Sequence, residues 1–282
     1  MNTKQFGKTG REVTEIGMGT YYDKPWIRVA KHGWSIGASR KIKALRAGLE
    51  GGIKLIDTAE AYFSEPFVAK AIRGRKRDEL FIATKVWLDH LHHDDLVMAL
   101  EKSLKRLELS YVDLYQIHFP SAHVPIRETM GAMEEMAAKG KIRAIGVSNF
   151  SLEQMVEANS VLAKSEIASA QLNYSLAHRK YEKDIIPYCN ANKIAVMAYY
   201  PLGHGMLARP SPKMEAVCRR NSKTPAQVAL NWLVSRPGVF AIPRASRPGH
   251  VREDLGGSDW RLSESDVADL EKEFPLEVTQ PS

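Results

Sequence analysis

The chain has 282 residues, 44% of them hydrophobic, and a net charge of +7, so it can bury a sizeable core. No run of about 18 apolar residues occurs, which excludes a membrane-spanning helix. The positive charge favours an anionic partner, but the densest basic run, residues 73–77, has no interleaved aromatic residues. We therefore expect a solvated connection there and no nucleic-acid partner.

The first predicted element is a small hairpin over residues 6–13, with Lys8-Thr9-Gly10 at its turn. A strand is expected at residues 16–21. Its pair of glycines, Gly17 and Gly19, lacks the third glycine and the helix start of a dinucleotide-binding fingerprint. Residues 21–37 have no clear periodic pattern and are expected to be irregular.

From residue 39 onward, helical and strand patterns alternate along the chain. One helix start is marked by Thr224-Pro225-Ala226-Gln227, where Thr and Gln form a capping box and Pro suits the first helical turn. A long loop over residues 201–223 is expected to contain one helix, and short helices are expected near His250 and after Ser263. The strands are predicted at residues 16–21, 53–57, 80–85, 112–118, 142–147, 167–172, 194–199 and 239–242.

These eight strands are mostly apolar and do not alternate, as expected where both faces of a sheet are buried. Eight βα units in fewer than 300 residues predict one α/β domain over residues 1–282, a (β/α)8 TIM barrel with an N-terminal β-hairpin and short extra helices. A doubly wound sheet is the alternative, but it would need a phosphate-binding glycine loop after an early strand, and the sequence has none.

Polar side chains stand where the predicted strands end, and the strand ends of such a barrel build its active site. In chain order they are Asp57, Lys85, His118, Ser148 with Asn149, Gln171, Tyr199 and Arg244. Each has a structural interpretation when taken alone, such as a helix cap or a hydrogen-bonded histidine. Together they converge on one rim, which random placement rarely achieves.

This group of residues suggests proton transfer to an oxygen atom. Asp57 and Lys85 can form an ion pair, and a positive charge about 4 Å from the phenol of Tyr62 is worth roughly 4 kcal/mol at an effective dielectric constant near 20. We therefore expect the pKa of Tyr62 to be lowered by up to about 3 units, toward neutrality. His118 would orient a carbonyl oxygen. No motif supplies a protein nucleophile, so a bound hydride donor is the natural partner.

The chain resembles the aldo-keto reductases over nearly its whole length. The matching segments, in the family's order, are Asp57–Tyr62, Ala83–Trp87, Gln116–His118, Gly146–Phe150, Gln171–Tyr174, Ala198–Gly203 and Ile242–Ser246. The resemblance implies a (β/α)8 oxidoreductase whose catalytic tetrad is Asp57, Tyr62, Lys85 and His118. Tyr62 would donate the proton in reduction and accept it in oxidation.

The resemblance also implies a nicotinamide cofactor across the barrel mouth, NADPH with NADH possibly also used. Ser148, Asn149 and Gln171 would hold its carboxamide, and Tyr199 would stack on its ring. The remaining cofactor-binding residues would be Gly19, Thr20, Tyr200, Pro201, Leu202, Gly203, Arg244, Ser246, Arg247, His250, Glu253 and Asp254. His250 stands where the family often has arginine, and Phe63-Ser64 departs from the family pattern after Tyr62.

The implied substrate is a small carbonyl compound or alcohol. Tyr21, Trp87 and Phe119 would line its pocket, with Tyr22 and Trp26 beside them, and the short tail after Phe274 would leave the pocket open. Two other functions stay open: an alcohol or sugar dehydrogenase working in oxidation, and a cofactor-sensing regulatory subunit.

The remaining polar residues give weaker signals. The run His90–Asp95 has metal-ligand residue types, but aspartates near a helix start favour a structural role, and we expect no metal. Cys189 and Cys218 lack metal-type spacing and are expected to be free thiols. Residues 1–5 lack the apolar core of a signal peptide, so a cytoplasmic protein is expected, either a monomer or a small homo-oligomer.

Overall fold

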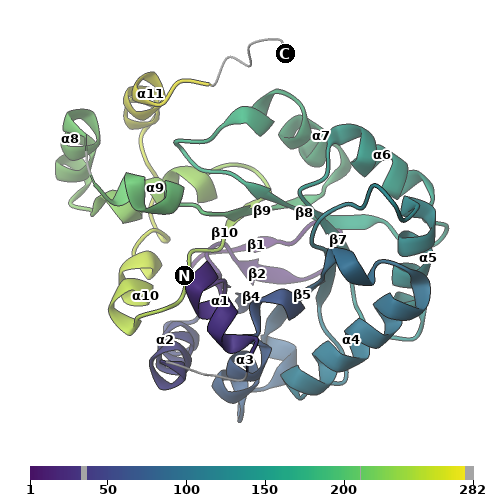
Figure 1. The fold of residues 1–282 in the computed structure, drawn as a ribbon. Coiled ribbons are helices and arrows are strands. Elements are labelled where there is room, and N and C mark those ends of the chain that lie inside the picture. Colours follow the sequence, from purple (N-terminus) through teal and green to yellow (C-terminus); the bar gives the residue numbers. More distant parts are fainter. Residues whose placement is uncertain (33–36, 210, 277–282) are drawn as a thin grey trace.

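The computed structural model describes residues 1–32, 37–209 and 211–276. Its main sheet has eight parallel strands, each paired with its neighbour in sequence, and helices cover the outside (Figure 1). The strands are β3 (Met18–Gly19), β4 (Leu55–Asp57), β5 (Phe81–Val86), β6 (Leu114–Ile117), β7 (Ile145–Ser148), β8 (Ile167–Asn173), β9 (Ala195–Tyr199) and β10 (Val239–Ala241). This order of strands confirms the predicted (β/α)8 barrel.

Parallel bridges join the first strand of the barrel to the last. Ile16 pairs with Ala241 and Gly19 with Arg244. The backbones approach so closely here that a Cβ atom on Gly19 would lie 2.9 Å from the carbonyl oxygen of Ile242. A glycine is therefore required at the seam where the barrel closes.

The helices alternate with the strands along the chain and pack against the outside of the barrel. They are α1 (Lys24–Ala30), α2 (Ala38–Glu50), α3 (Glu65–Ile72), α4 (His93–Leu107), α5 (Ile126–Ala138), α6 (Leu152–Ser160), α7 (Ile185–Asn192), α8 (Pro212–Asn221), α9 (Pro225–Val234), α10 (Pro248–Leu255) and α11 (Glu264–Glu273). Short 3-10 turns are η1 (Glu60–Tyr62), η2 (Arg77–Glu79), η3 (Leu88–His90), η4 (Lys180–Lys183) and η5 (Gly203–Ala208). None of the helices in these described segments combines the length and the apolar run that a membrane crossing requires.

The predicted capping box at the start of α9 is confirmed. The Thr224 hydroxyl accepts from the Gln227 N–H at 3.3 Å, and the Gln227 side chain accepts from the Thr224 N–H at 3.1 Å. The helix that follows is buried along its whole length, because it lies between the barrel and the outer helices α8 and α10 (Figure 1). Its many small and branched apolar residues suit that position.

Helix α1 was not predicted, and the expectation of an irregular segment is wrong for residues 24–30. The Asp23 side chain accepts a hydrogen bond from the Trp26 N–H at 2.7 Å, and Pro25 occupies the first turn. Trp26 buries its ring against Tyr22 and Phe67, with ring centroids 5.1 and 5.6 Å away. Tertiary packing therefore stabilises a helix too short to show an apolar periodicity. Residues 33–36 of the same segment lie outside the described residues.

The N-terminal hairpin closes the end of the barrel where the strands begin. Its strands β1 (Thr3–Gln5) and β2 (Glu12–Thr14) pair antiparallel, a few residues outside the predicted turn. The turn between them places Phe6 inside the barrel, 4.5 Å from the ring of Phe81 and 4.9 Å from that of Phe240. Phe81 is the first residue of β5 and Phe240 is the middle residue of the short strand β10, so Phe6 fills the amino-terminal end of the barrel.

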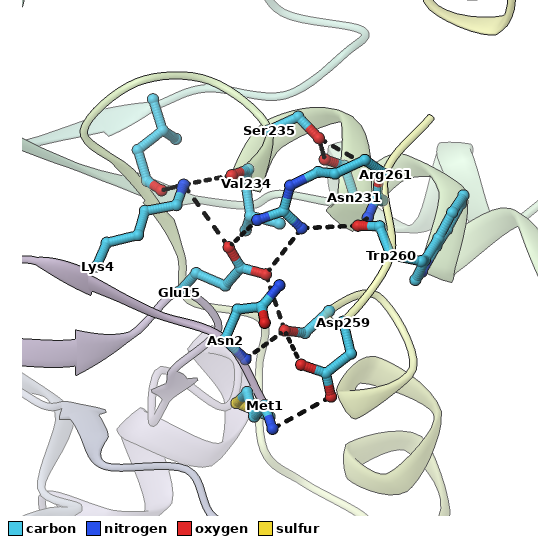
Figure 2. A network of polar contacts seen from close by, with 12 residues as sticks. Met1, Asn2, Lys4, Glu15, Asn231, Val234, Ser235, Asp259, Trp260 and Arg261 are labelled. Atoms are coloured by element: carbon cyan, nitrogen blue, oxygen red, sulfur yellow. Dashed lines mark hydrogen bonds and ion pairs between the residues drawn. The ribbon is translucent and has the colours of Figure 1, made fainter. Parts of the chain in front are cut away.

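A polar network fixes this hairpin to the C-terminal part of the chain (Figure 2). Glu15 is fully buried and accepts from Arg261 Nη2 at 2.6 Å and from the Ser258 hydroxyl at 2.8 Å. Lys4 Nζ lies 3.8 Å from the same carboxylate and donates to the carbonyl oxygens of Arg236 and Val239, at 3.2 and 3.1 Å. The buried carboxylate is thus paired and hydrogen-bonded, as a charge in the interior must be.

Candidate active site

A buried ion pair lies where β4 ends beside β5. Lys85 Nζ is 2.6 Å from Asp57 Oδ2 and donates a second hydrogen bond to the Thr58 carbonyl at 2.8 Å. The other carboxylate oxygen, Oδ1, accepts from Gln171 Nε2 at 2.9 Å and from Gln116 Nε2 at 3.4 Å. Burial lowers the pKa of Lys85, and the Asp57 charge raises it again in part. The predicted pairing of Asp57 with Lys85 is confirmed.

Tyr62 and His118 meet beside this pair. The 3-10 turn η1 follows β4 and carries Tyr62, whose hydroxyl lies 3.2 Å from His118 Nε2. Lys85 Nζ lies 4.8 Å from the centre of the Tyr62 ring. All four predicted tetrad residues therefore come together at the carboxyl ends of β4, β5 and β6. Each is buried, with no more than 9% of its surface exposed.

The surroundings of His118 fix its protonation. Burial, and then the charge of Lys85, lowers the pKa of His118 to about 2, so the ring is neutral. Within the described residues its Nδ1 atom is buried and makes no hydrogen bond. A buried N–H without an acceptor is rarer than a buried lone pair without a donor, so the proton belongs on Nε2. His118 then donates to the Tyr62 oxygen, and the Tyr62 O–H remains available to a third atom.

The pKa of Tyr62 differs from the prediction. It is raised well above its ordinary value, first by burial and then by the negative charge of Asp57 and by neighbouring tyrosines. The expected lowering toward neutrality is wrong because the Lys85 ammonium is already paired with Asp57 and the phenolate would be buried. Tyr62 therefore stays protonated, which is the form that a general acid requires.

Aromatic side chains surround the pair of Tyr62 and His118. The Trp87 ring meets the His118 ring edge to face at 5.0 Å, and the Phe119 ring stacks on it at 5.1 Å with an interplanar angle of 13°. Tyr21 meets the Tyr62 ring at 5.2 Å. The three residues predicted to line the substrate pocket thus contact the two that would face the substrate.

Tyr22 and Trp26, in contrast, do not reach this wall. Tyr22 is 1% exposed and Trp26 is 7% exposed, and both pack in the core between α1, α2 and α3. The Lys41 ammonium lies 4.9 Å from the ring centre of Tyr22 and 4.8 Å from that of Trp26. The prediction that they stand beside the substrate pocket is therefore wrong.

A hydrogen-bonded row links the ends of β6 to β9 next to His118. Asn149 Nδ2 donates to the His118 carbonyl and to the Ser148 hydroxyl, both at 3.0 Å, and the Tyr199 hydroxyl donates to Asn149 Oδ1 at 2.7 Å. The Ser148 hydroxyl donates to the Gln171 carbonyl at 3.1 Å. Within the described residues Gln171 Oε1 accepts no hydrogen bond, so an acceptor remains for an amide N–H of a ligand. This arrangement fits the carboxamide of a nicotinamide ring.

The other residues predicted near the cofactor lie at the same rim. Thr20 is buried, and its hydroxyl donates to the Asp57 carbonyl at 3.0 Å and accepts from the Ser64 hydroxyl at 2.9 Å. Its side chain therefore braces the site from within. After β9 the chain turns sharply, with positive φ angles at Tyr200 and Gly203. Pro201 and Leu202 between them are buried and half-buried.

The residues predicted for the adenosine end follow β10 and continue onto α10. Arg244, Arg247 and His250 are exposed and form no ion pair within residues 1–32, 37–209 and 211–276. Arg244 donates to the Tyr22 carbonyl. Ser246 and Glu253 are half-buried, and Asp254 is buried, which raises its pKa to about 8. Exposed basic side chains that have no acidic partner among the described residues suit a phosphate group.

The histidines around the start of α4 contact acidic side chains. His92 Nδ1 lies 3.0 Å from Glu128, and His93 lies 2.8 Å from both Asp94 and Glu135. His90 contacts Glu60 at 3.1 Å. The structure as described brings no three histidine, cysteine or acidic side chains together in a way that would hold a metal ion.

Sequence reasoning missed Gln116, which donates to Asp57. A signal was present, because residues two apart on a strand face the same side, and Gln116 precedes His118 by two positions. It also missed the bracing role of Ser64 and Glu65. Glu65 is fully buried and accepts from the Thr84 hydroxyl at 2.7 Å and from Arg106 at 2.6 Å.

The sequence is similar to a protein family and to several of its members. Residues 15–273 match the model of the aldo/keto reductase family. The aldo-keto reductase YhdN of Bacillus subtilis is 33% identical over 100% of this chain and 96% of its own length. The methylglyoxal reductase YeaE of Escherichia coli is 36% identical over 83% of this chain and 84% of its own length.

A comparison with solved structures also points to this family. An aldo/keto reductase from Klebsiella pneumoniae, in complex with NADP and acetate, superimposes with a TM-score of 0.88 at 34% identity, covering 99% of this chain and 97% of the other. The match spans the barrel and the rim that carries the tetrad. The chain therefore belongs to the aldo/keto reductase family, a family of NAD(P)H-dependent oxidoreductases.

Proposed function

We propose that this protein reduces an aldehyde or ketone to an alcohol with NADPH, and that Tyr62 supplies the proton. The observation that carries the proposal is the contact of the Tyr62 hydroxyl with His118 Nε2 at 3.2 Å, beside the buried pair of Lys85 and Asp57. This arrangement leaves the Tyr62 O–H aimed at a third atom, which we assign to the carbonyl oxygen of the substrate.

The four tetrad residues divide the work. When bound, a nicotinamide cofactor would supply the hydride for the carbonyl carbon. Tyr62 gives its proton to the carbonyl oxygen, which completes the alcohol, while the His118 Nε2–H holds the Tyr62 oxygen in place. The Lys85 ammonium, 4.8 Å from the ring centre, then stabilises the phenolate that is left, and Asp57 fixes Lys85. The same site can oxidise an alcohol, because the Tyr62 phenolate can take the proton back from the alcohol.

The basic residues after β10 support a preference for NADPH. Arg244 and Arg247 are exposed guanidinium groups near the start of α10, and a planar guanidinium matches a phosphate dianion. His250 lies in the first turn of α10, and its imidazole ring lacks the planar fork of donors that a guanidinium presents to a phosphate. We therefore expect NADPH to be preferred and NADH to be used at a measurable rate.

The substrate class follows from the aromatic wall and from the relatives. Trp87 and Phe119 flank His118, and Phe119 is 37% exposed at the mouth. Relatives are named methylglyoxal reductase and glyoxal reductase, the latter 34% identical over 80% of this chain. We propose small aldehydes, including 2-oxoaldehydes, together with simple aromatic aldehydes that can stack on the wall.

The test is the loss of NADPH absorbance on addition of methylglyoxal or benzaldehyde. The Tyr62→Phe variant should bind NADP with unchanged affinity but lose about 100-fold to 10,000-fold in turnover, the usual contribution of a general acid. Wild-type protein that binds NADPH but turns over neither aldehyde would contradict the proposal and favour a cofactor-sensing role. Replacing NADPH with NADH in the same assay gives the cofactor preference.

A further inference from the structure

The side chain of Glu60 joins the loop that carries Tyr62 to the loop after β5. Its Oε1 atom accepts a hydrogen bond from the Trp87 N–H and lies 3.1 Å from Nδ1 of His90. The Glu60 side chain is only 10% exposed. It therefore bridges the loop after β4 and the loop after β5.

The carboxylate holds both ends of one short turn. Trp87 precedes the 3-10 turn η3, and the His90 N–H closes that turn by donating to the Trp87 carbonyl at 3.0 Å. Glu60 binds the backbone N–H at the start of the turn and the imidazole at its end. The path of the backbone at Trp87 is thus set by a residue two positions before Tyr62.

The turn holds the Trp87 indole in the pocket wall. The indole meets the His118 ring at 5.0 Å with an interplanar angle of 86°, and the Phe119 ring at 5.7 Å with an angle of 83°. Edge-to-face contacts of this kind depend on the position and the tilt of both rings. A shift of the Trp87 backbone would change the wall that a substrate meets.

The contacts of Glu60 point to a role in positioning the turn after β5. The groups that shift the pKa of Tyr62 are the surrounding protein, Asp57 and nearby tyrosines, and those that shift the pKa of His118 are the surrounding protein and Lys85. The contacts of the Glu60 carboxylate are instead with the Trp87 N–H and the His90 ring. Its loss should leave the proton donor intact.

We propose that Glu60 is a positioning residue for substrate specificity, which fixes the Trp87 wall of the carbonyl pocket. This inference rests on the proposed reductase function of the same site. It separates two roles within one hexapeptide, because Asp57 and Tyr62 serve proton transfer while Glu60 serves substrate binding.

The first experiment compares three variants in the NADPH assay. Glu60→Ala removes the acceptor for the Trp87 N–H. A hydrogen bond to a charged group changes an equilibrium constant by about tenfold to hundredfold. KM for the aldehyde should therefore rise by about that factor. kcat should stay within about twofold of wild type, and so should the pH profile. Glu60→Gln keeps an acceptor oxygen and should restore most of the lost affinity.

The chain offers a matched control in Glu128. Its carboxylate accepts from the His93 N–H at 3.1 Å and lies 3.0 Å from the His92 ring, so it makes the same two kinds of contact at the start of α4, away from the pocket. Glu128→Ala should leave KM unchanged. An equal rise of KM in both alanine variants would show a general loss of stability and would overturn the proposal.

The second experiment needs no turnover. Acrylamide quenching of tryptophan fluorescence should increase in Glu60→Ala relative to wild type, and the difference should disappear when both proteins also carry Trp87→Phe. Inactive wild-type protein would contradict the proposed function while this measurement still tests the positioning role. Glu60→Ala with wild-type quenching, or with a reduced kcat at unchanged KM, would overturn the inference.

Discussion

Replacing Lys85 with methionine should destabilise the protein strongly. Methionine keeps much of the apolar stem but removes the ammonium that lies 2.6 Å from Asp57 and 2.8 Å from the Thr58 carbonyl. Lys85 is 0% exposed and Asp57 is 2% exposed, so the remaining carboxylate would be a buried charge without its counter-ion. Breaking a buried pair in this way costs about 3–5 kcal/mol.

The cost can be converted into a melting temperature. An unfolding entropy of about 2.1 cal/mol/K per residue, over 282 residues, gives about 0.6 kcal/mol/K. The Lys85→Met variant should therefore melt about 5–8 °C below wild type, measured by far-UV circular dichroism at neutral pH.

A surface lysine supplies the control. Lys139 pairs with Glu135 one helical turn away at 2.6 Å, but the two side chains are 57% and 40% exposed. Lys139→Met should cost no more than about 0.5 kcal/mol and shift the melting temperature by less than 1 °C on the same conversion. A Lys85→Met protein as stable as the Lys139 variant would refute the reasoning that the buried charge pair holds the site together.

Three further predictions concern pH and packing. The rate of aldehyde reduction should not change between about pH 6 and 9, because the pKa of His118 is lowered to about 2 and that of Tyr62 is raised by burial. An inflection near pH 7 that disappears on mutation of either residue would contradict this prediction. Hydrogen bonds to its two acidic partners raise the pKa of His93, so its contribution to stability is complete below about pH 6.5 and lost as pH rises through the folded-state pKa. Melting curves of wild type and His93→Gln should differ at pH 5.5 and coincide at high pH, and a constant difference would rule out titration of this group. Phe6→Ala should cost about 3–5 kcal/mol in chemical denaturation, since the ring is fully buried between two others; a loss below 1 kcal/mol would mean that the barrel end collapses around the gap.

The strand ends could be predicted from the sequence because the barrel geometry is simple. Asp57, Lys85 and His118 lie far apart in the chain, but each follows an apolar run, and parallel strands bring their carboxyl ends to one rim. The same rule placed Asn149 and Gln171 correctly beside them. The end of each apolar run in the sequence marks the end of a strand, and the position of the strand end places the side chain at the rim.

Properties that depend on burial and on long-range contacts could not be predicted. The pKa of Tyr62 was expected to fall because a lysine is near, but the desolvation of the phenolate outweighs that charge. Helix α1 depends on Trp26 reaching Phe67 on another helix, and no local pattern encodes that contact. The contact of Glu60 with Trp87 depends on how the loops after β4 and β5 meet, which neither loop sequence specifies.

The ring of Phe6 at the amino-terminal end of the barrel has a consequence for the order in which ligands bind and leave. Because that end is packed with three phenylalanine rings, the barrel axis is closed there and the tetrad is reached from the opposite rim. Cofactor and substrate would then enter through the same opening, and a ligand bound in the outer part of that opening would block access to the part beneath it. We therefore expect an ordered kinetic mechanism. In steady-state assays, the product that leaves last should be a competitive inhibitor with respect to the ligand that binds first.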